Sequence, residues 1–328
     1  MDNETIRKLR LALTAHADDL QLYANGLNAD AETEFELTAA RIFALIYRLQ
    51  KEFQKRGYTL DRETRKFLDS LRAQIGDIRA SIYEKMADDF DEQLPELVKE
   101  EKKFHSLFFA AAGWTVLANL PKITADRISE YGIYNGETRS QIISRLKADD
   151  IQRLYTVISN GLQQKLSLGE ILTEVEKKLN TGIRFADWET AVIVNGIAND
   201  ISMAIAADNG MDMLYSAVMD NNVCPECKEL NGKIFTADDP DLPVLPQHVN
   251  CRCMLIPVMG SEKEKLAPVS FAEYLKSMPE EEQRMRLGNE KYELWKQGEY
   301  TLKKYEPPTF GQKISLAELN LRTDRLFS

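Results

Sequence analysis

All four cysteines of this 328-residue chain fall in one stretch between positions 224 and 253. Cys224 and Cys227 form a C-x2-C pair, a spacing that lets two thiolates face one tetrahedral ion. After 20 intervening residues, His248 and Cys251 form an H-x2-C pair, and Cys253 follows two positions later. Soft thiolates combined with an imidazole select zinc, and four protein ligands are typical of a structural site. We therefore predict a structural Zn²⁺ bound by Cys224, Cys227, His248 and Cys251, with Cys253 as the alternative to His248.

Three other interpretations of these cysteines remain open at this point. Two disulfides would need an oxidising compartment, for which the chain carries no secretory sign. The thiols could instead stay free around a metal-free hairpin. A catalytic zinc would keep an open coordination position beside a general base, a role that Glu226 or Asp220 could fill.

The residues between the two ligand pairs are typical of a loop. Asn231-Gly232 is a strong hairpin signal that would turn residues 227–230 back into residues 233–235. The aspartates that follow, together with Pro243 and Pro246, exclude a regular element before His248. A bound metal would close this loop and contribute directly to the free energy of folding.

The composition limits the classes of protein to which this chain can belong. Lysines and arginines number 42 against 52 aspartates and glutamates, for a formal net charge of −10. Because affinity for phosphate backbones comes mainly from cations, nonspecific DNA binding by the whole chain is disfavoured, although a local contact with DNA is not. The N-terminus lacks the apolar core of a signal peptide, and no run of about 18 apolar residues is evident. We expect a soluble protein made in a reducing cytosol, with no membrane contact.

Apolar spacing predicts a mainly α fold. Long amphipathic helices are expected over residues 6–27, 35–53 and 61–90, and further helices over 138–162, 167–180 and 188–209. The helix expected over 167–180 should end at Asn180-Thr181-Gly182. Short strands over 214–219 and 254–258 should flank the cysteine loop of residues 224–253, here called the knuckle, and are placed to pair with each other. Capping boxes at Ser270 and Ser315 should begin short helices in a C-terminal tail. The predicted regions are an N-terminal helical region (1–120, bounded near Pro121), a central domain (121–260) and a tail (261–328).

The two remaining histidines do not suggest catalysis. His16 lies on the apolar stripe of the first helix and His105 stands among phenylalanines, so packing is expected for both. With His248 assigned to the metal, no histidine is left as a general base, and Ser-His-Asp or Cys-His catalysis has little support. Tyr292, Trp295 and Tyr300 are expected either to pack a small core in the tail or to act as exposed anchors.

The cysteine stretch resembles the phage Mu F-like minor head proteins, which act in head morphogenesis of tailed bacteriophages. The resemblance rests on a set of residues in order, namely Asp220, Cys224-Pro225-x-Cys227, Leu230-Asn231-Gly232-Lys233, Pro246-x-His248-x-Asn250-Cys251-Arg252-Cys253 and Pro257. It extends upstream over helices from about residue 134 to 209. Members often carry Arg-Thr-Glu in the helix before the loop, where this chain reads Ile193-Val194-Asn195-Gly196-Ile197, so no role of that triplet carries over.

The resemblance implies a structural assembly protein of the virion that binds the portal and other head proteins, is made in the bacterial cytoplasm, and acts in procapsid assembly and DNA packaging or delivery. It implies no enzymatic activity. Two rival classes are a zinc-dependent hydrolase or nuclease using Asp220 or Glu226, and a zinc ribbon reading nucleic acid through Lys228, Lys233 and Arg252.

Overall fold

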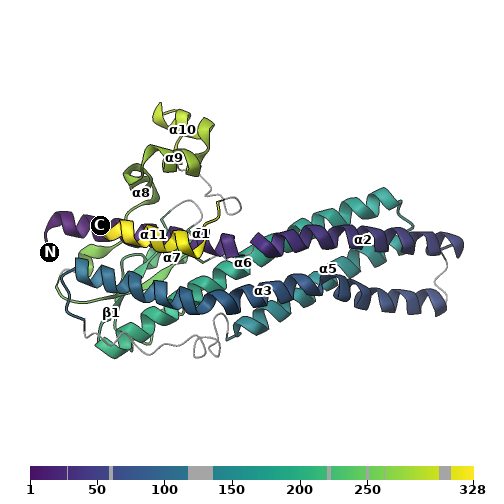
Figure 1. Cartoon of the computed structure of the whole chain (residues 1–328), viewed down its shortest axis with the longest axis horizontal. Helices are drawn as coiled ribbons and strands as arrows, with labels where there is room; N and C mark the ends of the chain where they lie inside the picture. Colours follow the sequence, from purple (N-terminus) through teal and green to yellow (C-terminus); the bar gives the residue numbers. More distant parts are fainter. Residues whose placement is uncertain are drawn as a thin grey trace. The chain divides into compact units, whose positions relative to one another are not determined.

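The computed structural model describes residues 1–27, 29–58, 62–116, 136–219, 223–248, 251–261, 263–302 and 312–328. Within these residues most of the chain is helical and one small sheet is present, which confirms the predicted mainly α fold (Figure 1). The long helices are α1 (Asn3–Leu27), α2 (Ala29–Lys55), α3 (Arg62–Ala111), α5 (Arg139–Gln163) and α6 (Leu168–Asn209). The short helices are α7 (Pro225–Leu230), α8 (Phe271–Ser277), α9 (Glu280–Leu287), α10 (Asn289–Lys296) and α11 (Leu316–Phe327).

The chain divides into two compact units. Unit 1 takes Met1–Gly26, Gln93–Gly136 and Thr190–Ser328, and unit 2 takes Leu27–Glu92 and Glu137–Glu189. These units draw on segments that are far apart in the sequence, and they cut across the three regions expected at 1–120, 121–260 and 261–328. Those sequence regions stay a prediction about how the chain is organised, and Pro121 itself lies outside the described residues.

Unit 2 is a bundle of helical segments from α2, α3, α5 and α6 around a continuous apolar core. The apolar stripes of all four segments meet in this core, as their spacing predicts. Its largest members include Ile42, Phe53, Leu71, Leu154 and Leu179, each at most 6% exposed. The first turn of α5 is fixed by a capping box, in which Thr138 Oγ1 accepts from the Gln141 backbone N–H and the Gln141 side chain accepts from the Thr138 N–H.

A buried ion pair crosses the unit 2 core. Arg79 Nε lies 2.8 Å from Asp150 Oδ2, and Arg79 Nη1 donates to Thr38 Oγ1 at 2.7 Å. Both charged side chains are fully buried. The Arg79 guanidinium also lies over the Phe35 ring, 4.4 Å from its centroid. This link between α3 and α5 was not predicted from the spacing of the residues.

The predicted helix end at Asn180-Thr181-Gly182 is wrong, because α6 runs without interruption from Leu168 to Asn209. Gly182 allows close packing against α6 and does not form a turn. A Cβ atom added there would lie 2.9 Å from Asp150 Oδ1 and 3.4 Å from the Phe35 ring. The glycine therefore marks where α6 passes close to the buried carboxylate, and this close approach was mistaken for a helix end.

The third helix also exceeds its predicted length. α3 reaches Ala111, well beyond the predicted end at residue 90. Pro95 lies inside it. Apolar side chains that are buried on either side of the proline, Phe90, Leu94, Leu97 and Val98, hold the helix in place despite the lost donor.

In unit 1 a three-stranded antiparallel sheet packs beside the end of α6. Its order is β2 (Ile234–Phe235), β1 (Asp212–Ser216) and β3 (Met254–Val258), with Leu214 opposite both Ile234 and Ile256. The pairing of the strand before the knuckle with the strand after it was predicted and is confirmed. The C-terminal tail forms a small core together with Ala15 of α1, in which Tyr292 is buried and Trp295 and Tyr300 pack against it.

Both histidines outside the loop are buried in unit 1, as expected. His16 is stacked on Phe104, with ring centroids 3.5 Å apart, and its Nε2 lies 3.2 Å from Glu101 Oε2. His105 Nε2 lies 3.0 Å from Ser202 Oγ. Burial lowers the pKa of His105 to about 4, so this ring is neutral at physiological pH.

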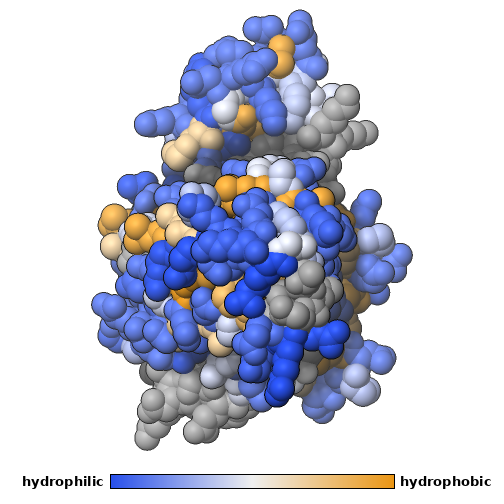
Figure 2. Space-filling view, turned by 90° about the vertical axis from the view of Figure 1, so that its right-hand side faces the viewer, coloured by the Kyte–Doolittle hydropathy of each residue, from blue (hydrophilic) through white to orange (hydrophobic). Residues whose placement is uncertain are grey.

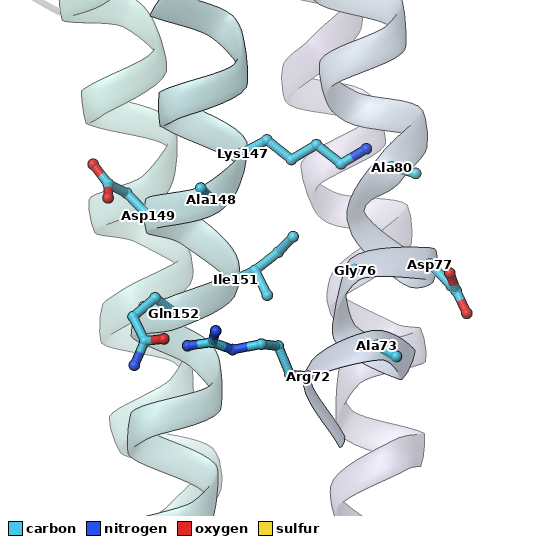
Figure 3. A pocket seen from close by; sticks show the side chains of 10 residues that line it. All are labelled: Arg72, Ala73, Gly76, Asp77, Ala80, Lys147, Ala148, Asp149, Ile151 and Gln152. Carbon is cyan, nitrogen blue, oxygen red and sulfur yellow. The ribbon is translucent and has the colours of Figure 1, made fainter. Parts of the chain in front are cut away.

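On its surface, unit 2 carries a shallow groove between α3 and α5 (Figure 3). Small side chains form much of its wall, among them Ala73, Gly76 and Ala148. Lys147 extends from α5 toward α3 and Arg72 extends from α3 toward α5, whereas Asp77 and Asp149 point away. The Arg72 guanidinium lies over the Tyr155 ring, 5.4 Å from its centroid, so this side chain already has a partner within the unit.

The view in Figure 2 shows mainly hydrophilic side chains, with hydrophobic ones in separate small patches. Among the described residues, α6 is long and apolar enough to cross a membrane by length and composition. However, 78% of its most apolar window is buried inside the fold, which is the behaviour of a core helix. The absence of membrane contact stays a prediction.

Candidate metal centre

The loop between β1 and β3 brings all five predicted ligand candidates together. The potential ligand atoms of Cys224, Cys227 and His248 lie within 4.8 Å of one another, and so do those of Cys227, Cys251 and Cys253. The two groups share Cys227. The predicted set of Cys224, Cys227, His248 and Cys251 is therefore divided between two overlapping triads, and which four bind one ion stays a prediction.

The first cysteine pair is positioned by a short helix, which corrects one expectation. Residues 227–230 were predicted to form one arm of a hairpin, but they belong to α7, whose N-cap is Cys224. The Cys224 Sγ accepts from the Cys227 backbone N–H at 3.3 Å, and Pro225 stands in the first turn. This turn directs both sulfurs to the same side.

The Asn231-Gly232 turn is present, and it connects α7 to β2. Gly232 has a φ of +84°, which glycine adopts without strain. Its N–H donates to the Tyr215 carbonyl at 2.9 Å, and the Asn231 side chain accepts from the Ala217 N–H at 2.9 Å. The turn thereby fastens the first half of the loop to the central strand β1.

The second ligand pair is held from the other side by α6. Cys251 N–H donates to the His248 carbonyl at 3.0 Å, which closes the H-x2-C turn. Asn195 Nδ2 donates to the Cys251 carbonyl at 3.0 Å, and Asn199 Nδ2 donates to the Cys253 carbonyl at 3.2 Å.

Asn199 fixes the loop at a second point. Its Oδ1 accepts from the Leu255 N–H at 2.7 Å, so one side chain spans both sides of the Cys253-Met254-Leu255 segment. Asn195 and Asn199 are almost completely buried, at 1% and 2% exposed. The asparagines lie four residues apart on one face of an apolar helix, and that spacing was the available signal for a polar contact. Asn195 is also the centre of the stretch that departs from the family's usual triplet.

Two further polar side chains approach Cys227. The Tyr215 hydroxyl lies 3.3 Å from Cys227 Sγ and 2.8 Å from Gln247 Oε1, while His248 Nε2 lies 3.4 Å from the same sulfur. Tyr215 is fully buried on β1. Its position in the expected strand 214–219 did not indicate a contact with the cysteines.

All four cysteines are free thiols, so the disulfide interpretation finds no support in this geometry. Cys227, Cys251 and Cys253 are buried, and Cys224 is partly exposed. Hydrogen bonds from the thiols of Cys251 and Cys253 lower the pKa of Cys227, and the same contacts raise the pKa of Cys253. Burial raises the pKa of Cys224 to about 11.

Without a metal, Cys227 is thus the preferred thiolate and its neighbours are the donors that stabilise it. A cation entering this cluster would replace those thiol protons, which is the behaviour of a thiolate metal site. The donor set of four soft sulfurs and one imidazole fits zinc.

The residues offered for the rival functions are placed less favourably. Glu226 is exposed on α7, and Asp220 lies outside the described residues. Lys228 and Lys233 are exposed and Arg252 is partly buried, while two of the nearby aspartates, Asp238 and Asp241, are also exposed. This mixed surface gives no strong electrostatic footprint for nucleic acid.

Comparison with known families agrees with the resemblance noted from the cysteine loop. Residues 126–256 match the family model described as Phage Mu protein F like protein. The matched range contains α5, α6, the sheet almost to its end and all five ligand candidates. This part of the chain is therefore similar to a family of phage head-related structural proteins. No curated protein and no solved structure matches the chain.

Proposed function

We propose, from the Phage Mu F-like match over residues 126–256, that this protein is a minor head protein of a tailed phage and works by binding. It associates with the portal and neighbouring head proteins during procapsid assembly, in the cytoplasm of the bacterial host, and stays in the virion. There it assists DNA packaging or delivery. The net charge of −10 makes protein contacts a better explanation of this role than extensive direct contact with DNA.

The metal centre serves this function as a structural cross-link. The convergence of five soft ligand candidates in one loop is the observation that carries it. Cys224, Cys227, His248 and Cys251 would hold one Zn²⁺, with Cys253 as the alternative fourth ligand. A closed four-ligand site supplies folding free energy and leaves no position for substrate. The ion would fix α7 and the H-x2-C turn against the sheet, and so give a rigid surface to a loop that has little apolar core of its own.

The test combines metal analysis with capture of the partner. The full chain is purified, its zinc content is measured by mass spectrometry, and portal protein from the same phage is captured on immobilised wild type, Cys224→Ser and Lys228→Ala. Lys228 is exposed on the same short helix, so Lys228→Ala is the matched control.

Wild type and Lys228→Ala should carry one zinc and retain portal. Cys224→Ser should lose zinc and portal binding together. A wild type that binds neither zinc nor portal would overturn the proposal. Zinc without portal binding would leave the centre intact and refute the portal role.

A further inference from the structure

Cys227 differs from the other candidate ligands because it belongs to both triads and touches a buried hydroxyl. The Tyr215 oxygen lies 3.3 Å from Cys227 Sγ. Two backbone hydrogen bonds fix Tyr215 itself, since its N–H donates to the Lys233 carbonyl at 2.8 Å and its carbonyl accepts from Gly232 at 2.9 Å. Its register partner on the other edge of β1 is Leu255. The hydroxyl is therefore held in one place before any ion binds.

The hydroxyl carries one hydrogen but has two acceptors within reach. Besides the sulfur, Gln247 Oε1 lies 2.8 Å away, and this amide oxygen is 3.6 Å from the same sulfur. A thiolate bound to a metal can only accept.

We propose that Tyr215 is a positioning residue of the metal centre, which donates its hydroxyl hydrogen to the Cys227 thiolate when the ion binds. The inference rests on the proposed metal centre and extends it to a residue that is not a ligand. Gln247 completes the chain by turning its amide, so that its NH₂ group donates to the Tyr215 oxygen. The two amide orientations differ little in shape, so the turn needs no movement of the backbone.

The physical role of this bond is to stabilise the excess negative charge of the centre. A site with three thiolates around Zn²⁺ carries a net charge of −1, and one with four carries −2. Burying that charge is unfavourable unless donors satisfy it. Cys251 and Cys253 act as donors only while they are protonated, and ligation removes their protons. The buried hydroxyl remains a donor to Cys227 after all the thiols have ionised. Hydrogen-bonding neighbours of metal ligands typically change metal affinity by about 10- to 100-fold.

The experiment compares Tyr215→Phe with Tyr23→Phe in the full chain. Tyr23 is a matched control, because it is also buried in unit 1 and its hydroxyl also lies near a glutamine oxygen, Gln93 Oε1 at 3.2 Å. Zinc affinity is measured by competition with a chromophoric chelator. Cobalt(II) is then substituted for zinc, and the sulfur-to-cobalt charge-transfer band is recorded.

Tyr215→Phe should bind one equivalent of zinc with an affinity roughly 10- to 100-fold below that of wild type. Its charge-transfer band should move to lower energy, because a sulfur without a hydrogen bond gives up electron density more readily. Tyr23→Phe should match wild type in both measurements. A merely destabilised fold would weaken binding without moving the band.

Two outcomes overturn the inference and are distinguishable. If wild type binds zinc and Tyr215→Phe has the same affinity and the same cobalt band, Tyr215 does not act on the sulfur, while the metal centre stands. If wild type binds neither zinc nor cobalt, the metal centre fails, and the role of Tyr215 fails with it. Gln247→Leu provides a second test, because it should lower the zinc affinity less than Tyr215→Phe does.

Discussion

The two compact units stabilise polar groups in opposite ways. Unit 2 buries Arg79 and Asp150 within a bundle whose apolar core is complete without them. Unit 1 gathers its thiols in a loop held by hydrogen bonds from the Asn195 and Asn199 side chains and by a two-residue strand. In the bundle, packing positions the polar groups. In the loop, the polar groups must position the chain, and we therefore expect the order of the loop to depend on the proposed ion.

The largest effect should come from removing the ligand that both triads share. Cys227→Ser should reduce zinc affinity by more than the roughly 100-fold upper range for neighbours of ligands. Chelation of the wild type with EDTA should reproduce the variant. Limited proteolysis should then cut within residues 228–247, while far-ultraviolet circular dichroism keeps the signal of the long helices. Equal protection of this loop with and without metal would remove the contrast between the units.

The buried pair in unit 2 should respond to mutation in the manner of a packed core. Asp150→Asn leaves the Arg79 guanidinium uncompensated, so the free energy of unfolding should fall by about 3–5 kcal/mol. Replacing both groups, with Arg79→Met and Asp150→Leu, should recover much of that loss, because the apolar surroundings accept side chains of this size. Urea denaturation followed by circular dichroism measures both changes. A double variant as unstable as Asp150→Asn would show that the pair itself holds the bundle together.

A pH titration should separate the units further. His105 in unit 1 has its pKa lowered by burial to about 4, against an ordinary value near 6.5. Between these values the histidine is protonated in the unfolded chain but neutral in the folded chain. The free energy of unfolding therefore falls as pH falls from about 6.5 to 4.

The loss attributable to this histidine should reach about 3 kcal/mol, because each pKa unit corresponds to about 1.36 kcal/mol. His105→Gln can still pair with Ser202 but does not titrate. The difference in unfolding free energy between wild type and this variant should therefore change with pH across that window. A difference independent of pH would show that His105 titrates normally.

The asparagine contacts to the loop should give a smaller effect. Asn199→Ala leaves the Cys253 carbonyl and the Leu255 N–H without their partner, at a cost of about 1–3 kcal/mol. Asn209→Ala is the control, since that side chain donates to the Ile205 carbonyl of its own helix. Thermal unfolding of the zinc-loaded proteins should show a lower midpoint for Asn199→Ala alone. Equal midpoints would mean that the ion holds the loop without help from α6.

The elements that could be predicted from sequence were those with a period or a spacing. The stripes of the long helices, the pairing of β1 with β3 and the convergence of Cys227 with Cys251 all follow from local rules. Gly182 was misread because a glycine looks the same in sequence whether it ends a helix or lets another side chain approach. α7 was missed because six residues are too few to show a helical period.

Tyr215, Asn195 and Asn199 were missed as site residues for a different reason. Their roles depend on which atoms lie opposite them in the folded chain. Neither the hydroxyl of a strand tyrosine nor the amides of two helix asparagines indicate their partners, which stand between 12 and 56 residues away along the sequence. The spacing of residues in a sequence predicts contacts only between residues a few positions apart. These contacts, in contrast, form only after the sheet and α6 have come together.

The order of strands in the sheet bears on how the protein is made. β1 is the central strand, yet its two partners are synthesised after it, with Cys224 and Cys227 preceding both. During translation, a reactive thiol pair therefore leaves the ribosome before β3 exists to enclose it. We therefore expect an oxidising expression host to yield more cross-linked material, with less bound zinc, than a reducing one.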